Sequence, residues 1–154
     1  MHAVAPRVVA EKKSQHTQYA ALPYRVRAGR LEVLLITTLR TQRWIVPKGW
    51  PIEGLPPHAC AAFEALEEAG VSGDIQKRPL GSFAYGKQRK NGDIVRCTVA
   101  VFALKVTRER KSWAESGTRK LRWCAPEEAA QTVRELGLRR LLIEFGRAFT
   151  ALPA

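Results

Sequence analysis

Short apolar runs, separated by glycine, proline and charged residues, recur along most of the chain. The run from Leu31 to Thr38 is rich in apolar and β-branched residues, which is typical of a strand, and Thr17–Arg27 has a similar pattern. The three residues between them read Ala-Gly-Arg and indicate a turn. The sequence therefore predicts a β-hairpin over residues 17–38.

Further strands and helices follow in a mixed order. The helical spacing of apolar residues predicts one helix from Pro57 to Ala69 and two amphipathic helices after residue 124, separated near Gly137. The proline-rich stretch 47–57 predicts a loop. An order of strands, helix, strands and helices predicts an α/β sandwich around a mixed sheet. The other predicted strands are Arg43–Pro47, Leu80–Lys87, Ile94–Val106 and Arg119–Cys124.

The length of 154 residues is typical of one domain. We expect a mobile, polar N-terminal arm over residues 1–16 and a single domain over residues 17–154. The apolar run at the N-terminus is too short for a signal peptide, and no later run is long enough to span a membrane. We therefore expect a cytoplasmic protein with no membrane partner, and the oligomeric state stays open.

The chain is strongly basic, with 26 Lys and Arg against 14 Asp and Glu and a formal net charge of +12. This charge favours anionic partners such as nucleic acid or phosphorylated metabolites, although a solvated basic surface is equally compatible with it. The cysteines, Cys60, Cys97 and Cys124, are scattered and form no CxxC motif. They predict small buried hydrophobes rather than a disulfide framework or a zinc site.

The helix predicted at 57–69 carries an acidic cluster in this basic chain. At about 100° per residue, Glu64, Glu67 and Glu68 share an arc of about 100°, opposite an apolar face that includes Phe63. Carboxylates three or four residues apart repel one another, and the helix carries no Lys or Arg. Either a basic side chain from elsewhere or a hard cation such as Mg²⁺ or Mn²⁺ should relieve them, unless the face is simply solvated.

The stretch GWPIEGLPPHACAAFEALEEAGV, residues 49–71, resembles the signature of the Nudix hydrolases. That signature is Gly, five residues, Glu, seven residues, then Arg-Glu-U-x-Glu-Glu-x-Gly-U, where U is aliphatic. WIVPKG before it and RKLRWCAPEEAA near the C-terminus are similar to branches that act on dinucleoside polyphosphates and diphosphoinositol polyphosphates. The resemblance covers most of residues 17–150 and implies a Nudix-type α/β/α sandwich around a mixed β-sheet. The matching positions are Gly49, Glu64, Glu67, Glu68, Gly70 and Val71.

Two polar positions of the signature are apolar in this chain. Leu55 stands where the family has its first Glu, and Phe63 stands where it has Arg. In the family that arginine helps to hold the loop and to orient the first helical Glu. Replacing both polar partners costs less than orphaning one. We expect Leu55 to pack near Phe63, so that apolar contact holds the loop.

The resemblance implies a divalent-metal-dependent hydrolase of a diphosphate bond in a nucleoside or other polyphosphorylated organic substrate, with Mg²⁺ or Mn²⁺ as cofactor. The implied catalytic residues are the three helical carboxylates, and Glu64 either binds metal or activates the water. The basic residues beside the loop are candidates for binding substrate phosphates. The implied metal ligands are Gly49, Glu64, Glu67, Glu68 and, from a later loop, Glu115; the phosphate-binding candidates are Arg40, Arg43 and Lys48.

Two alternatives stay open. One is an RNA 5′-end pyrophosphohydrolase, for which the net charge of +12 would help through contacts with the nucleic-acid backbone. The other is a non-catalytic Nudix-fold module that binds nucleotides or nucleic acid. Retention of all three helical carboxylates argues against the second alternative, because a pure binder gains nothing from their repulsion.

Overall fold

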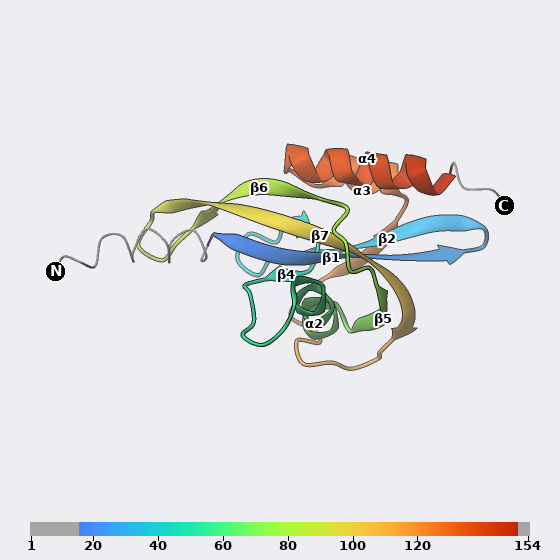
Figure 1. Cartoon of the computed structure of the whole chain (residues 1–154), viewed down its shortest axis with the longest axis horizontal. Coiled ribbons are helices and arrows are strands. Elements are labelled where there is room, and N and C mark those ends of the chain that lie inside the picture. The colour runs from blue at the N-terminus through green and yellow to red at the C-terminus, as the bar shows by residue number, and fades with distance from the viewer. Residues whose placement is uncertain (1–15, 151–154) are drawn as a thin grey trace.

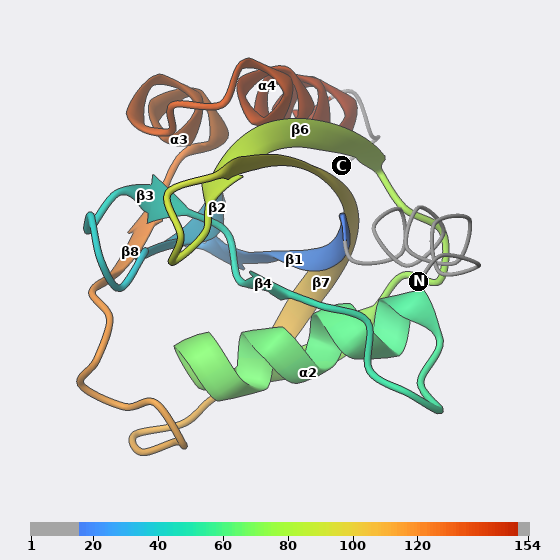
Figure 2. The ribbon, with the colours of Figure 1, turned by 90° about the vertical axis from the view of Figure 1, so that its left-hand side faces the viewer.

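The computed structural model describes residues 16–150. These residues form a sheet with helices on both of its faces (Figures 1 and 2). The elements, in chain order, are β1 (Thr17–Arg27), β2 (Arg30–Thr37), β3 (Trp44–Ile45), β4 (Lys48–Gly49), α2 (Pro57–Ala69), β5 (Val71–Ile75), β6 (Gly81–Gln88), β7 (Ile94–Glu109), β8 (Leu121–Cys124), α3 (Pro126–Thr132) and α4 (Leu136–Thr150).

Strand β1 organises the sheet. It pairs antiparallel with β2 through a tight turn and parallel with β7 from Thr17↔Thr98 to Tyr24↔Lys105. The main strand order is β3-β2-β1-β7-β5, with β4 on β1, β6 on β7 and β8 on β2. One parallel pairing among antiparallel ones makes the sheet mixed, which confirms the predicted α/β class.

The helices cover the two faces of the sheet unequally. Helix α2 lies on one face, against β1, β4 and β5, whereas α3 and α4 lie together on the other (Figure 2). Strand β2 buries five consecutive residues, from Val33 to Thr37, as expected for a strand covered on both faces. Cys60, Cys97 and Cys124 are buried and form no disulfide bond, as predicted.

The structure contains a strand that the sequence did not predict. Strand β5 follows α2 directly and pairs with β7, although Gly73 and Asp74 are poor strand formers. Its register shifts between Ser72 and Gly73, where the backbone of β7 comes so close that a Cβ on Gly73 would lie 1.9 Å from the carbonyl oxygen of Lys105. Tertiary pairing therefore decides the conformation of this segment.

Two predicted boundaries also differ. The strand predicted at 43–47 is only β3, and the predicted loop contains β4, which pairs with β1. The break between α3 and α4 lies at residues 133–135, and Gly137 belongs to α4. That glycine is required by packing, because a Cβ there would lie 2.8 Å from the Cβ of Phe83.

Of the predicted arm, only His16 belongs to the described residues, and its carbonyl oxygen accepts a hydrogen bond from the N–H of Thr98. The rest of that arm, and residues 151–154 of the predicted domain, lie outside them. Across residues 16–150, none of the helices is both long enough and apolar enough to cross a membrane.

The end of α2 is fixed by Gly70, which has a φ of +68° and whose N–H is directed at the carbonyl oxygens of Ala65 and Leu66. This left-handed conformation favours glycine at a helix C-terminus. The ring of Trp113 covers the glycine so closely that a Cβ would lie 2.4 Å from its Cε3 atom. The contact attaches the segment between β7 and β8 to the end of α2.

We predict that Gly70→Ala lowers the free energy of unfolding by about 2–4 kcal/mol, the sum of the left-handed backbone cost and the clash with Trp113. The Trp113→Leu background should absorb part of this cost by removing the clash. Urea unfolding of both single variants and the double variant measures the coupling. Strictly additive losses would show that the indole ring does not restrict position 70.

Candidate active site

Helix α2 presents its carboxylates at the border of its buried face. The buried residues are Cys60, Ala61, Ala65, Glu68 and Ala69, an arc centred about 50° from Glu64. The prediction that Phe63 belongs to the core face was wrong, because its side chain is 43% exposed. The acidic and buried faces overlap, so Glu64 and Glu68 lie between the helix and the sheet.

Gly49 and Glu64 come together, as the spacing of the motif implied. Strand β4 pairs with the start of β1 and passes beside α2. A Cβ on Gly49 would lie 2.1 Å from Oε2 of Glu64, so any larger residue would displace the Glu64 side chain from this position. The N–H of Lys48, the preceding residue, donates to Oε1 of Glu68 at 3.1 Å.

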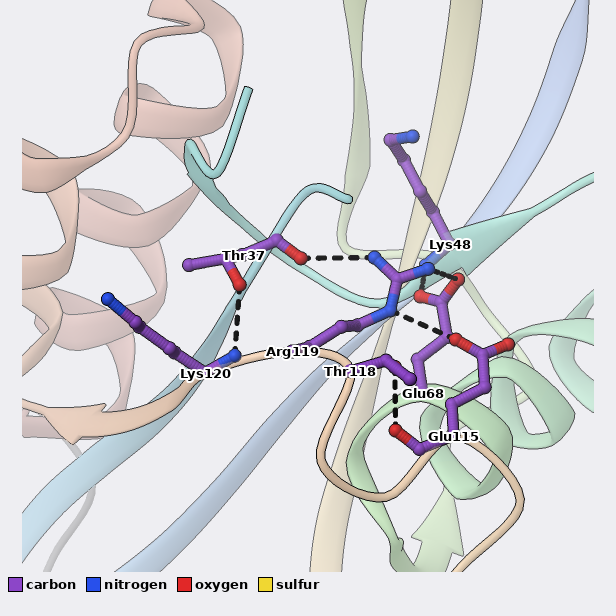
Figure 3. Close-up of polar contacts among 7 residues, drawn as sticks. All are labelled: Thr37, Lys48, Glu68, Glu115, Thr118, Arg119 and Lys120. Carbon is purple, nitrogen blue, oxygen red and sulfur yellow. Dashed lines mark hydrogen bonds and ion pairs between the residues drawn. The ribbon is translucent and has the colours of Figure 1, made fainter. Parts of the chain in front are cut away.

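A guanidinium from a distant part of the chain lies against this cluster (Figure 3). Arg119, just before β8, donates through an Nη atom to Oε2 of Glu68 at 3.1 Å and through Nε to Oε1 of Glu115 at 3.1 Å. Its other Nη atom donates to the carbonyl oxygen of Thr37 at 3.0 Å. The side chains of Arg119 and Glu68 are each only 11% exposed, so the contact between them is largely shielded from water, whereas that of Glu115 is 37% exposed.

The predicted additional carboxylate, Glu115, lies at the same place. Its backbone N–H donates to the carbonyl oxygen of Glu67 at 3.3 Å, and its own carbonyl oxygen accepts from the N–H and hydroxyl of Thr118. The contact of Trp113 with Gly70 holds the same segment two residues earlier. The structure therefore brings Glu115 to α2.

Burial dominates the electrostatics of the cluster. Burial, followed by the neighbouring charges of Glu68, Glu115 and Glu67, raises the pKa of Glu64 to about 7 against the opposing effect of Arg119. Burial also raises the pKa of Glu68, despite Arg119 and the N–H of Lys48. A second positive charge would stabilise the ionised form of this cluster.

The donors of the cluster suit a hard divalent cation. Carboxylate and carbonyl oxygens are the ligands that Mg²⁺ and Mn²⁺ prefer, and the close approach at Gly49 brings β4 beside Glu64. Within the described part of the chain, however, no three acidic, histidine or cysteine side chains are arranged to hold a metal ion as they stand. Two of the carboxylates are instead hydrogen-bonded to Arg119.

The candidate phosphate-binding residues do not all reach the cluster. Arg40 is exposed in the turn between β2 and β3. Arg43 donates to Oε2 of Glu135 at 2.8 Å, so its side chain is directed at the junction of α3 and α4. The side chain of Lys48 runs away from the carboxylates (Figure 3).

Lys48 belongs instead to a basic–aromatic cluster of Lys48, Trp50, Tyr85 and Lys87. Nζ of Lys48 lies 4.7 Å from the ring centre of Tyr85, and Nζ of Lys87 lies 5.9 Å from that of Trp50. Burial, followed by the charge of Lys87, lowers the pKa of Lys48 to about 8. The cluster therefore places cationic and aromatic groups beside β4.

The loop before α2 is held by a cysteine. The thiol of Cys60 accepts a hydrogen bond from the N–H of Ile52 and donates to the carbonyl oxygen of Leu55. Leu55 is 42% exposed and Phe63 is 43% exposed. The expected contact between them stays a prediction, and the backbone hydrogen bonds to Cys60 supply a restraint that does not need it.

Comparison with known proteins shows which family this site belongs to. The family model described as NUDIX domain matches residues 16–145. The chain belongs to the Nudix family. It is 33% identical over 122 residues to Nudix hydrolase 12, mitochondrial, of Arabidopsis thaliana, covering 77% of this chain and 60% of the relative. It is 36% identical over 106 residues to diphosphoinositol polyphosphate phosphohydrolase 3-alpha of Mus musculus, covering 67% and 60%.

Solved structures show the same fold. A crystal structure of the Ap4A hydrolase of C. elegans has a TM-score of 0.61 and 24% identity, covering 88% of this Nudix chain and 98% of that one. A binary complex of a C. elegans Ap4A hydrolase has a TM-score of 0.66 and 21% identity. The chain spans about three fifths of the length of the curated relatives described above.

The family motif locates the helical carboxylates but not Arg119. The sequence predicts a strand at Arg119–Cys124, within the stretch that resembles family branches, but assigns Arg119 no place in the site. The repulsion on α2, which carries no Lys or Arg, predicts that a basic side chain from elsewhere or a metal ion relieves it, unless the face is solvated. The sequence cannot say which of 26 basic residues supplies that side chain, because the contact joins positions 51 residues apart.

The raised pKa of Glu64 predicts a pH dependence of stability in chelator. The unfolded carboxyl titrates near 4.5 and the folded one near 7, so folding binds protons between these values. The wild type should therefore lose stability relative to Glu64→Gln as the pH rises from about 4.5 to about 7, and the difference should then level off. Urea unfolding of both proteins across this range measures it. A constant difference, or one of opposite slope, would contradict the raised pKa.

Proposed function

We propose that this Nudix domain hydrolyses a diphosphate bond in a polyphosphorylated organic substrate with the help of a divalent metal ion. The observation that carries the proposal is the meeting of Glu64, Glu67 and Glu68 with Gly49 from β4 and Glu115 from the segment before β8. A binding surface for anions alone would be weakened by four carboxylates in one place. A cation site explains why they are collected.

The proposed metal ligands are the carbonyl oxygen of Gly49 and the carboxylates of Glu64, Glu67, Glu68 and Glu115. When bound, Mg²⁺ or Mn²⁺ neutralises phosphate charge and lowers the pKa of a coordinated water. Glu64 either completes the ligand set or takes the proton of the attacking water. Its position against Gly49 serves both roles.

The basic–aromatic cluster suits the remainder of the substrate. Lys48 and Lys87 offer positive charge to phosphate oxygens, and Trp50, which is 39% exposed, offers a ring face to an apolar or planar group. Diphosphoinositol polyphosphates and dinucleoside polyphosphates are therefore the first substrates to test. The names of the relatives from Mus musculus and Bos taurus support the former class.

RNA bearing a 5′-triphosphate is the second candidate. The net charge of +12 supports it through contacts with the nucleic-acid backbone. The cytoplasmic location stays a prediction alongside these proposals, since curated relatives include proteins named as mitochondrial and chloroplastic.

We predict metal-dependent phosphate release from at least one substrate in a panel of diphosphoinositol polyphosphates, dinucleoside polyphosphates, nucleoside triphosphates, nucleotide sugars and 5′-triphosphorylated RNA. Glu67→Gln should reduce kcat by about 10²–10⁴-fold, the range for removal of a group that acts on the reacting water or its ligands. Steady-state assays with Mg²⁺, Mn²⁺ or chelator measure both effects.

Glu144→Gln is the matched control, because this exposed glutamate belongs to α4 on the opposite face of the sheet. It should leave kcat and KM unchanged. Activity that persists in chelator, or that survives Glu67→Gln, would contradict the proposal. No hydrolysis of any substrate, combined with salt-sensitive binding of RNA, would favour the non-catalytic module.

A further inference from the structure

Arg119 is the counter-charge of the acidic cluster in the structure. Among residues 16–150, it alone forms an ion pair with a carboxylate of α2. Its guanidinium bridges Glu68 and Glu115 and also contacts the carbonyl oxygen of Thr37 (Figure 3). Both Arg119 and Glu68 have side chains that are 11% exposed. Removing one partner of an ion pair this well shielded from water is strongly destabilising, because it leaves the other charge buried and uncompensated.

The helix itself cannot provide this charge. It has no basic residue, and the position where the family signature has arginine is the exposed Phe63. The guanidinium therefore comes from the other side of the site, on the segment that also supplies Glu115. This arrangement links the positive charge and the fourth carboxylate in a single piece of chain, four residues apart.

We propose that Arg119 and the divalent metal substitute for one another at the acidic cluster. Arg119 balances Glu68 and Glu115 while the site is free of metal, and the two carboxylates leave the guanidinium to become ligands when the metal binds. The proposal rests on the proposed function for the presence of a metal, and it adds the side chain with which the metal competes.

The contacts of Glu68 support an exchange. Its Oε1 accepts from the N–H of Lys48 and its Oε2 accepts from Arg119, so each oxygen already has a donor. The carboxylates held in this way do not form a ready set of three metal-ligating side chains within the described residues. A guanidinium and a divalent cation beside the same carboxylates also repel each other. The hydrogen bond to Thr37 keeps Arg119 beside the site without needing either carboxylate.

If Arg119 and the metal substitute for one another, the stabilisation by metal should depend on whether Arg119 is present. It should not depend on Arg119 if the role of this arginine is purely structural. Without Arg119, the metal-free protein keeps the largely buried carboxylate of Glu68 without its ion-pair partner, and the metal then supplies the missing charge. Metal should therefore stabilise a protein lacking Arg119 more than it stabilises the wild type. If Arg119 only held the segment before β8 in place, removing it would lower the stability by the same amount with and without metal.

The test compares thermal unfolding of wild type, Arg119→Met, Arg119→Lys and Arg122→Met in chelator and in saturating Mn²⁺. Arg119→Met should lower the Tm in chelator by about 6–12 °C, as expected for breaking a buried ion pair in a domain of this size. The rise in Tm caused by Mn²⁺ should be larger in this variant than in wild type. Its dissociation constant for Mn²⁺, measured by calorimetric titration, should fall by about tenfold, because a neighbouring unit charge is removed.

Arg122→Met is the matched control. Arg122 belongs to β8, is 39% exposed and pairs with the exposed Glu128, outside the acidic cluster. Its response to Mn²⁺ should equal that of wild type. Arg119→Lys keeps the charge but cannot bridge two carboxylates in the same way, so its Mn²⁺ affinity should lie between those of wild type and Arg119→Met.

A Mn²⁺ effect on Arg119→Met that is equal to or smaller than that on wild type would overturn the proposal while leaving the proposed function intact. Absence of Mn²⁺ binding by wild type and every variant would overturn both. If Arg119→Met does not fold in chelator, the Mn²⁺ titration of Arg119→Lys decides: tighter binding than wild type supports exchange, and equal or weaker binding overturns it.

Discussion

Repulsion among four carboxylates beside α2 is the constraint on which the surrounding structure depends. Glu64, Glu67 and Glu68 share one side of the helix, and the segment before β8 adds Glu115. Neighbouring elements reduce this repulsion. Strand β4 contributes Gly49, which leaves room for Glu64, and the N–H of Lys48, and the segment before β8 contributes the guanidinium of Arg119. The sheet topology serves this arrangement, because pairing of β4 with β1 places Gly49 beside the helix.

The acidic cluster lowers the stability of the fold. Burial raises the pKa values of the half-buried Glu64 and the buried Glu68, and Arg119 opposes this rise without cancelling it. A protein selected only for stability would place apolar residues at such positions. Sites that hold cations or substrates commonly carry such local conflicts, compensated elsewhere in the fold. Here the compensation comes from the closely packed sheet and from the contact of Trp113 with Gly70, which fixes the end of α2.

The sequence predicted those parts of the site that depend on local spacing. The motif placed Gly49, Glu64, Glu67 and Glu68 together, and helical periodicity gave α2 its bounds. Prediction from the sequence failed where tertiary contacts determine the local conformation. Strand β5, for example, forms because β7 pairs with it, despite Gly73. The predicted core face of α2 is confirmed at Ala65 and Ala69 but wrong at Phe63, because the buried side of the helix is turned toward Glu68, beside β4.

Long-range partners were equally beyond sequence reasoning. Arg119 reaches Glu68 across 51 positions, and Arg43 reaches Glu135 across 92, whereas charge counting indicated only that some partner must exist. The loop before α2 gives a similar lesson. The missing Glu and Arg of the signature suggest an apolar contact between Leu55 and Phe63, which stays a prediction, but they give no sign that the thiol of Cys60 bonds the loop backbone.

The central claim is that the acidic cluster is a divalent cation site. Anomalous X-ray diffraction from crystals grown with Mn²⁺ tests it most directly, because the anomalous signal locates the ion independently of its surroundings. The account predicts a peak within coordination distance, about 2.0–2.3 Å, of the Gly49 carbonyl oxygen and of carboxylate oxygens from α2. Crystals that show no peak there at saturating Mn²⁺, with Arg119 still bridging Glu68 and Glu115, would contradict it.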